Sequence, residues 1–478
     1  MKKNWITSTG KTYLIVIILI ILFIVINLCV RNIDLAQIDV TENKLYSITD
    51  STKQAIKDIN QQVTIYAFGY EESSPLIDLL KQYKRENNNI NYELLSKATN
   101  PEKVAEYELE DGYSIVVVEC NGSHKLIDGS YQFYTYDYTT GQSIDTTEQT
   151  ITNAILSLTV EEKPKVYFTT GHGEYSLEQL NVIQTYLKNE VYEVEEINLL
   201  TQDNVLDDCA VLAIMTPTSD FIEKEAESIK NYINKGGNII FFRDIELNKK
   251  EYPIFQSILD LYGVTMEDGC IIETNTKNMV SSQYPNIIIP ELSSTHDITK
   301  YLYSSNGYLV MMYAGRIKIA DEETLNNLGV ESETIISSSD TSVYIEDLSN
   351  ISLDGVTDKG SNTIGAVLTK TINNQETNES AVSKLVVVAN NYFTTDYKES
   401  TLSSTYPFSY FGNNKDILLN SVAYLTKRED TLTIRKDMKN TTYAATVNEN
   451  RIILTIIFAV PIIIIIIGIV VWNIRKRK

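Results

Sequence analysis

Two long apolar segments near the ends of the chain constrain its fold most strongly. Tyr13 to Val30 contains a single strongly polar residue, Asn27, and Ile452 to Trp472 contains no charged residue. At about 1.5 Å per residue, a helix of the second length reaches about 30 Å, the thickness of a bilayer's hydrocarbon core. The sequence therefore predicts transmembrane helices at residues 13–30 and 452–472.

Basic residues outside these segments predict their orientation. Three lysines precede the first segment, and the run at 475–478 follows the second. By the positive-inside rule, residues 1–12 and 473–478 face the cytoplasm, and the long segment between the helices lies outside it. The first segment could instead be a signal peptide, but it is longer than a usual apolar core and no small-x-small cleavage pattern follows. We therefore expect a protein that crosses the cell membrane twice.

Charge and cysteine content exclude several functions. The formal net charge of −22 repels nucleic acid and anionic lipid headgroups, so we expect no nucleic-acid partner and a solvated acidic surface. Cys29 lies in the first apolar segment, and the remaining three cysteines, Cys120, Cys209 and Cys270, are widely spaced. They predict neither a disulfide framework nor a zinc site, although one bridge among the three stays open.

Residues 31–162 have the pattern of a small α/β domain. Apolar alternation predicts strands at 63–68 and 90–95 with a helix at about 74–85 between them. Asn121-Gly122 then separates two strand-like runs, a strong hairpin signal. A βαβ unit followed by a hairpin predicts a thioredoxin-like domain, here without the CxxC motif, so the resemblance concerns the scaffold alone.

Residues 163–428 have the pattern of a second, larger α/β domain. Short apolar strands alternate with helices between residues 165 and 260, and a strand and a helix at 384–389 and 416–426 resume the pattern. This predicts a doubly wound parallel sheet covered by helices on both faces. The Ser-, Asn- and Thr-rich segment at about 265–380 is expected to be a β-rich insertion, and residues 429–450 a polar stalk.

The segment KPKVYFTTGHGE, residues 163–174, predicts a buried strand that ends in a glycine-rich loop. In open α/β sheets, ligands bind at this end of a strand, so Gly171, His172, Gly173 and Glu174 are candidate ligand-binding residues. The loop could hold a sugar hydroxyl, an amide or a metal, although one His-x-Glu pair is weak evidence for metal. Alternatively, His172 and Glu174 bond the loop's own backbone and cap a helix near Ser176.

Catalytic motifs are missing from the sequence. No segment has the complete motif of a phosphate-binding loop: Gly355 and Gly360 have its spacing, but Ser361 stands where lysine is needed. An ATP-driven process would therefore need another chain. There is no GxSxG elbow, and Cys209 precedes its predicted strand instead of following it. We therefore expect no enzyme, no catalytic residues, no bound metal and no cofactor.

The order of several segments resembles the GldG-type auxiliary proteins of ABC transport systems. These segments are residues 47–68, KVYFTTGHGE at 165–174, the run at 215–244 and KLVVVAN at 384–390. Gly171 to Glu174 match the family's GHGE loop, and matches to other family positions are Pro217, Gly236, Gly237 and Asp244. Ile245 departs from the family, in which a proline often follows the aspartate.

The resemblance implies a role and partners. Such proteins are thought to work beside an ABC-2-type permease and a cytoplasmic ATPase, and their central domain resembles amidotransferase-like folds that are proposed to bind sugars. We expect a non-catalytic, substrate-contacting or scaffolding membrane subunit of an ABC-type transport system. The alternatives are a free-standing cell-surface protein that binds a carbohydrate or another envelope ligand, and a hydrolase that depends on His172.

Overall fold

The computed structural model describes residues 48–110, 114–137, 142–160, 162–246, 250–348, 357–373, 380–400 and 406–428, with four isolated positions nearer the ends. These ranges belong to one compact unit, Ile48–Lys439. Within them, no helix is both long enough and apolar enough to cross a bilayer. Apart from the isolated positions, the predicted membrane helices at 13–30 and 452–472 and the stalk at 429–450 lie outside the described residues.

The N-terminal lobe, residues 48–160, is built on a four-stranded sheet in the order β2-β1-β3-β4. β1 and β2 are parallel with a helix between them, and β3 and β4 form an antiparallel hairpin, so the predicted order of a βαβ unit and a hairpin is confirmed. Asn121 and Gly122 have φ angles of 50° and 79°, as a tight hairpin turn requires. Its elements are α2 (Asp50–Lys57), β1 (Val63–Phe68), α3 (Pro75–Glu86), β2 (Ile90–Leu95), α4 (Pro101–Glu106), β3 (Ile115–Cys120), β4 (Ser123–Asp128), β5 (Tyr134–Asp137), β6 (Gln142–Asp145) and α5 (Thr147–Thr159).

The central domain is organised by an eight-stranded sheet in the order β15-β18-β20-β21-β10-β9-β7-β8. The five strands from β21 to β8 are parallel, and β20, β18 and β15 continue the sheet in antiparallel pairs. The strands are β7 (Lys165–Thr169), β8 (Glu193–Ile197), β9 (Cys209–Met215), β10 (Asn238–Phe242), β15 (Glu291–Leu292), β18 (Val330–Ser337), β20 (Thr363–Asn373) and β21 (Ser380–Val388).

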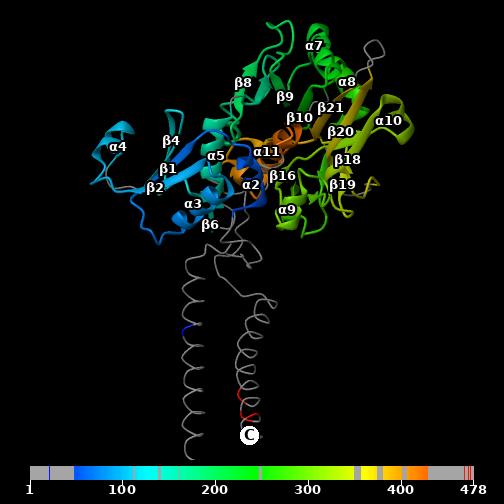
Figure 1. The fold of residues 1–478 in the computed structure, drawn as a ribbon. Helices are drawn as coiled ribbons and strands as arrows, with labels where there is room; N and C mark the ends of the chain where they lie inside the picture. Colours follow the sequence, from blue (N-terminus) through cyan, green and yellow to red (C-terminus); the bar gives the residue numbers. More distant parts are fainter. Residues whose placement is uncertain are drawn as a thin grey trace, which may run out of the picture. The chain divides into compact units, whose positions relative to one another are not determined.

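Helices cover both faces of this sheet. Successive strand residues point to opposite faces, so each strand contributes to two cores. Val166 and Phe168 pack in one core with α6 (Asn181–Asn189) and α11 (Asn414–Leu425), whereas Tyr167 packs in a second core with α7 (Glu223–Asn234) and α8 (Pro253–Leu259). Figure 1 shows α7 and α8 side by side, next to the ribbons of β9 and β10. The predicted mixed α/β class with helices on both faces is thereby confirmed.

The predicted parallel sheet with a β-rich insertion at 265–380 needs a correction. β18 and β20 come from this segment, yet they extend the central sheet, and β20 pairs with every residue of β21. The sheet is therefore mixed. Isolated apolar runs show that strands form, but they do not show which strands become partners.

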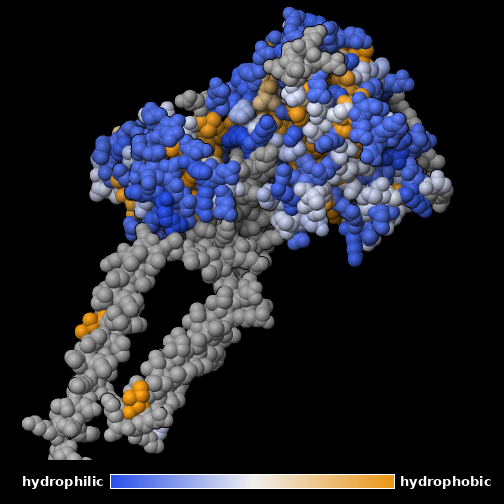
Figure 2. Space-filling view, turned by 45° about the vertical axis from the view of Figure 1, so that its right-hand side comes forward, coloured by the Kyte–Doolittle hydropathy of each residue, from blue (hydrophilic) through white to orange (hydrophobic). Residues whose placement is uncertain are grey.

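The rest of that segment forms small sheets and short helices that flank the central sheet. The elements are β11 (Val264–Glu267), β12 (Cys270–Ile272), β13 (Met279–Ser281), β14 (Tyr284–Ile288), α9 (Lys300–Ser304), β16 (Met311–Met312), β17 (Arg316–Ile319), α10 (Glu322–Leu328) and β19 (Val343–Ile345). The 3-10 helix η1 (Asp260–Tyr262) precedes them and directly follows α8. Two further 3-10 helices, η2 (Tyr392–Thr394) and η4 (Phe408–Tyr410), precede α11. In Figure 2, hydrophilic residues cover most of the described surface on the visible face, and hydrophobic residues gather only in small groups.

Candidate functional site

The candidate site lies at the carboxyl edge of the parallel strands. β7 runs into the loop Gly171–Glu174, β9 ends at Met215 just before Thr216–Ser219, and β10 ends just before Asp244. β21 belongs to the same parallel set and leads to Asn390 and Asn391. Because these strands are parallel, the four chain segments that follow them meet at one edge of the sheet, where ligands of open α/β sheets bind.

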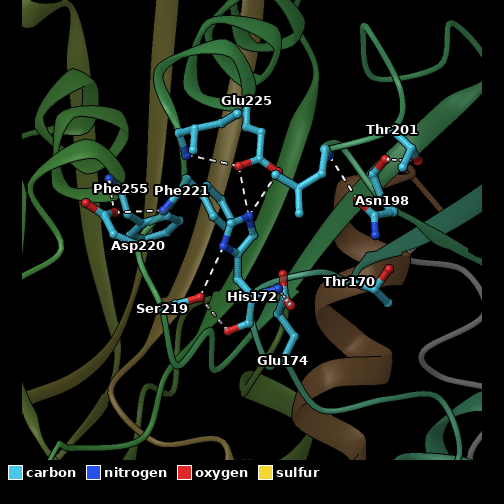
Figure 3. A network of polar contacts seen from close by, with 12 residues as sticks. Thr170, His172, Glu174, Asn198, Thr201, Ser219, Asp220, Phe221, Glu225 and Phe255 are labelled. Atoms are coloured by element: carbon cyan, nitrogen blue, oxygen red, sulfur yellow. Dashed lines mark hydrogen bonds and ion pairs between the residues drawn. The ribbon is translucent and has the colours of Figure 1, made fainter.

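His172 is held between two other side chains. Its Nδ1 lies 3.2 Å from Ser219 Oγ, and its Nε2 lies 3.0 and 2.8 Å from the two carboxylate oxygens of Glu225. Figure 3 shows the imidazole ring between these two residues. A carboxylate oxygen accepts hydrogen bonds, so we assign a ring proton to Nε2. The Ser219 hydroxyl has one proton and two acceptors within reach, Nδ1 and the His172 carbonyl oxygen, which lies 3.3 Å away.

Glu225 connects this histidine to the start of a helix. Its Oε2 accepts a hydrogen bond of 3.0 Å from the backbone N of Ile222, which precedes the first turn of α7. A carboxylate at this position satisfies a free amide and interacts favourably with the helix dipole. Glu225 is 1% exposed and His172 7% exposed, so the pair is a buried structural connection.

In the alternative interpretation of the loop, the bond of Glu174 to the loop's own backbone is present, but the cap of a helix near Ser176 is wrong. α6 begins at Asn181 instead of near Ser176, and the loop is connected to α7 through Glu225. Glu174 instead bonds within the loop, where its Oε2 accepts from the backbone N of His172 at 2.7 Å. Its Oε1 is buried and has no hydrogen-bond partner among the described residues.

The backbone of the loop is fixed by the segment after β9. The carbonyl of His172 accepts hydrogen bonds from the backbone N of Thr218 at 2.8 Å and of Ser219 at 3.1 Å. Gly171 and Gly173 are exposed and have φ angles of 119° and 80°, which side chains rarely adopt. A Cβ on Gly173 would lie 2.0 Å from Thr218 Oγ1. Both glycines are therefore required by conformation, and Gly173 also by contact.

Asp244 joins three of the strand ends. Its Oδ1 accepts from the backbone N of Asn391 at 2.7 Å and of Tyr392 at 2.8 Å, and its Oδ2 accepts from the Tyr175 hydroxyl at 3.0 Å. Burial raises the pKa of the Asp244 carboxyl above its usual range, against the opposing effect of these hydrogen bonds. This residue matched the family pattern in sequence, and the structure gives it a role in holding the edge together.

Thr216 has a strained backbone conformation and lies at the carboxyl edge of the sheet. Its φ angle is 54°, which is unfavourable for a β-branched residue. Its Oγ1 accepts hydrogen bonds from the backbone N of Asp244 at 3.2 Å and from Asn391 Nδ2 at 3.1 Å. Such strain persists where the surroundings enforce it, and it concentrates at functional sites.

The structure gathers only some of the residues that the sequence singled out. His172 and Glu174 come together with Ser219 and Glu225, which sequence reasoning missed. The one signal for Glu225 was an acidic residue in the first turn of the predicted helix. His296 lies elsewhere: its Nδ1 accepts from the backbone N of Ile298, and burial lowers its pKa.

The part of the chain that the structure describes contains neither a metal centre nor a disulfide. No group of three or more His, Cys, Asp or Glu side chains there has an arrangement that could hold a metal ion. Cys120, Cys209 and Cys270 are all buried free thiols. The bridge that the sequence left open among these three is therefore not formed.

Comparisons with known proteins identify two family models along the chain. Residues 163–421 match the model described as ABC-type uncharacterized transport system, and residues 42–127 match a domain of unknown function, DUF7088. No curated protein matches the chain.

A comparison with solved structures finds two with low similarity to this chain. The mmIFT52 N-terminal domain is 12% identical with a TM-score of 0.38, and the similarity covers 55% of this chain and 97% of that one. A putative ThuA-like protein from Parabacteroides merdae is 8% identical with a TM-score of 0.31, and the similarity covers 60% of this chain and 94% of that one.

The family match over residues 163–421 includes the whole candidate site and more than half of the sequence. The chain therefore belongs to the family described as ABC-type uncharacterized transport system.

Proposed function

We propose that this protein is a non-catalytic accessory subunit of an ABC-type transport system, working with a separate permease and a separate ATPase. The observation that carries this proposal is the family match over residues 163–421, which supports a transport-associated accessory role. The absence of a phosphate-binding loop from the sequence agrees with an ATPase on another chain. We further propose that the chain belongs to the GldG-type branch of this family.

The proposal includes a location and a finer fold. The protein is anchored in the cell membrane by helices at 13–30 and 452–472, both termini are cytoplasmic, and the described domains lie outside the cytoplasm. The apolar length of both segments and the flanking basic residues support this topology. The strand order β2-β1-β3-β4 supports a thioredoxin-like N-terminal lobe, and the parallel strands β21 to β8 support an amidotransferase-like central domain.

Within this role, the loop Gly171–Glu174 is the ligand-contacting segment. Three observations support this assignment: the loop follows β7 at the carboxyl edge, both glycines are exposed, and Glu174 Oε1 has no partner among the described residues. His172 is a positioning residue, since both of its ring nitrogens already contact protein groups.

Copurification tests the accessory role. The full chain is isolated in gentle detergent from its native membrane, and the associated proteins are identified by mass spectrometry. The proposal expects a permease and an ATPase in stoichiometric amounts, and a second membrane protein of similar abundance serves as the control bait. If neither subunit accompanies the protein, the assembly is wrong, and a free-standing protein that binds a glycan or another envelope component becomes the better interpretation.

A hydrolase is the second candidate, because one specific arrangement favours it. Ser219 Oγ, the His172 ring and the Glu225 carboxylate form a continuous hydrogen-bonded series, as a nucleophile, a base and an orienting acid would. Ser219 Oγ also lies 3.3 Å from the carbonyl of His172, as expected for a hydroxyl that supports the loop. A fluorophosphonate probe separates the two roles. Labelling of the wild-type chain that is lost in Ser219→Ala would support the hydrolase, and an unlabelled wild-type chain would support the accessory role.

A further inference from the structure

A separate cavity opens between the N-terminal lobe and α6. Its volume is about 230 Å³, and none of its lining residues belongs to the network around His172. The walls include Lys125 from β4, Gln149 and Asn153 from α5, Tyr186 from α6, and Glu190, which directly follows α6. A water site needs only about 10–15 Å³ on this scale, so the cavity has room for a small organic molecule.

Asn153 is a largely buried polar residue in the wall of this cavity. The residue is 7% exposed, yet its side-chain amide makes no hydrogen bond to any residue that the structure describes. The amide atoms still reach solvent through the cavity, so they can bond to a molecule that enters it. The neighbouring Gln149 amide is also without a hydrogen bond in the described ranges. The cavity therefore presents two unused amide groups to whatever occupies it.

Lys125 brings a positive charge to the same cavity. Within the described ranges it forms no ion pair and no hydrogen bond, although the chain as a whole is strongly acidic. Burial and the nearby charge of Lys163 lower the pKa of its ammonium group. The lining contains one acidic residue, Glu190, which is 2% exposed. A single negative charge therefore suits the cavity better than two.

We propose that this cavity binds a small monocarboxylate, which pairs with the Lys125 ammonium group and accepts hydrogen bonds from the Asn153 and Gln149 amides. This site goes beyond the accessory role and does not depend on it. A carboxylate satisfies the unpaired cation and the unused donors together, and its apolar part packs against Tyr186. Because Lys125 is the single basic residue of the lining, a doubly charged anion such as phosphate is matched less well.

Lysine acylation measured by mass spectrometry tests the site on the wild-type full chain in detergent. An N-hydroxysuccinimide ester is applied in sodium chloride, acetate, lactate or benzoate at equal ionic strength. At least one carboxylate is expected to slow acylation of Lys125 about threefold or more. Lys57, exposed on α2 in the same lobe, should be unaffected. Equal Lys125 labelling in chloride and in all three carboxylates, or equal protection of Lys57, overturns the proposal.

Two variants and a phosphate control test which groups recognise the carboxylate. Asn153→Leu keeps the branched shape of the side chain without the amide, so a folded variant should lose most of the protection of Lys125. Gln149→Met serves the same purpose from a less buried position. If both variants keep full protection, the amides have no part in binding and the assigned recognition is wrong. Inorganic phosphate should protect Lys125 less than the best carboxylate does. Equal protection by phosphate would indicate an adventitious ion only.

Discussion

The Nε2 atom of His172 lies 2.8 Å from the Oε2 atom of Glu225, and both side chains are buried. His172→Ala would leave the Glu225 carboxylate buried without this partner, so we expect a loss of about 2–4 kcal/mol in the free energy of unfolding. Denaturant unfolding of the variant measures it. Glu223→Gln, exposed in the same helix turn, is the control and should change stability by less than about 0.5 kcal/mol.

A double-mutant cycle tests whether the effect belongs to the pair. His172→Ala should cost clearly less in a Glu225→Gln background, since the neutral amide is less costly to leave unpaired. Equal costs in both backgrounds would mean that the pair is not coupled. A loss near zero in the single variant would instead assign His172 to ligand contact.

Asp244 predicts a pH dependence of stability. Its pKa is raised in the folded state, so the folded protein binds the proton more tightly than the unfolded chain does. Its contribution is therefore most favourable at low pH and declines as pH rises from the ordinary aspartate pKa through the raised one. Asp244→Asn cannot ionise, so the stability of wild type relative to this variant should fall as pH rises. A difference that stays constant, or grows, from acidic to neutral pH would contradict this expectation.

Gly173 predicts a steric effect with a closely matched control. Gly173 and Gly122 have φ angles of 80° and 79°, but only Gly173 faces a neighbouring side chain. Gly122→Ala should cost about 1–2 kcal/mol for the left-handed backbone. Gly173→Ala should cost about 1–3 kcal/mol more because its Cβ meets Thr218 Oγ1. Adding Thr218→Ala should recover most of that excess, and a failure to recover it would show that the contact with Thr218 is not the cause.

The buried thiols predict low reactivity. Burial raises the pKa of Cys209 to about 11 and that of Cys270 to about 12. At pH 8, about one Cys209 in a thousand would be the reactive thiolate. Iodoacetamide should therefore label both residues only after unfolding, as peptide mapping can measure. Rapid alkylation of either thiol in the folded protein would contradict the buried environment.

The sequence predicted local structure better than long-range pairing. Strand alternation placed β1 and β2 at the residues that the structure shows, because the period of two is a local consequence of strand geometry. Gly236, with a φ angle of 89°, follows the C-cap of the helix before β10, a position where left-handed glycines are common. The partnership of β20 with β21 was missed because no local pattern specifies which edge a distant strand will join.

The candidate site was located by sequence but its contacts were not. The position of the GHGE loop at the end of β7 followed from the strand and its glycines. The contacts of His172 with Ser219 and Glu225 depend on how the segment after β9 folds back over the loop, and these residues lie 47 and 53 positions away. Hydrogen bonds between segments so far apart are a property of the assembled sheet edge.

The parallel pairing of β10 with β21 also determines the order in which the domain can form. Ser383 hydrogen-bonds to the carbonyl of Gly237 from 146 positions further along the chain. During synthesis, the apolar edge of β10 therefore stays without this neighbour until the ribosome has completed β21. Contacts that close so long a loop slow folding and lengthen the exposure of unpaired strands. A chaperone that binds nascent chains would have its most important target in this interval, when β7, β8, β9 and β10 exist without the strand that completes the parallel set.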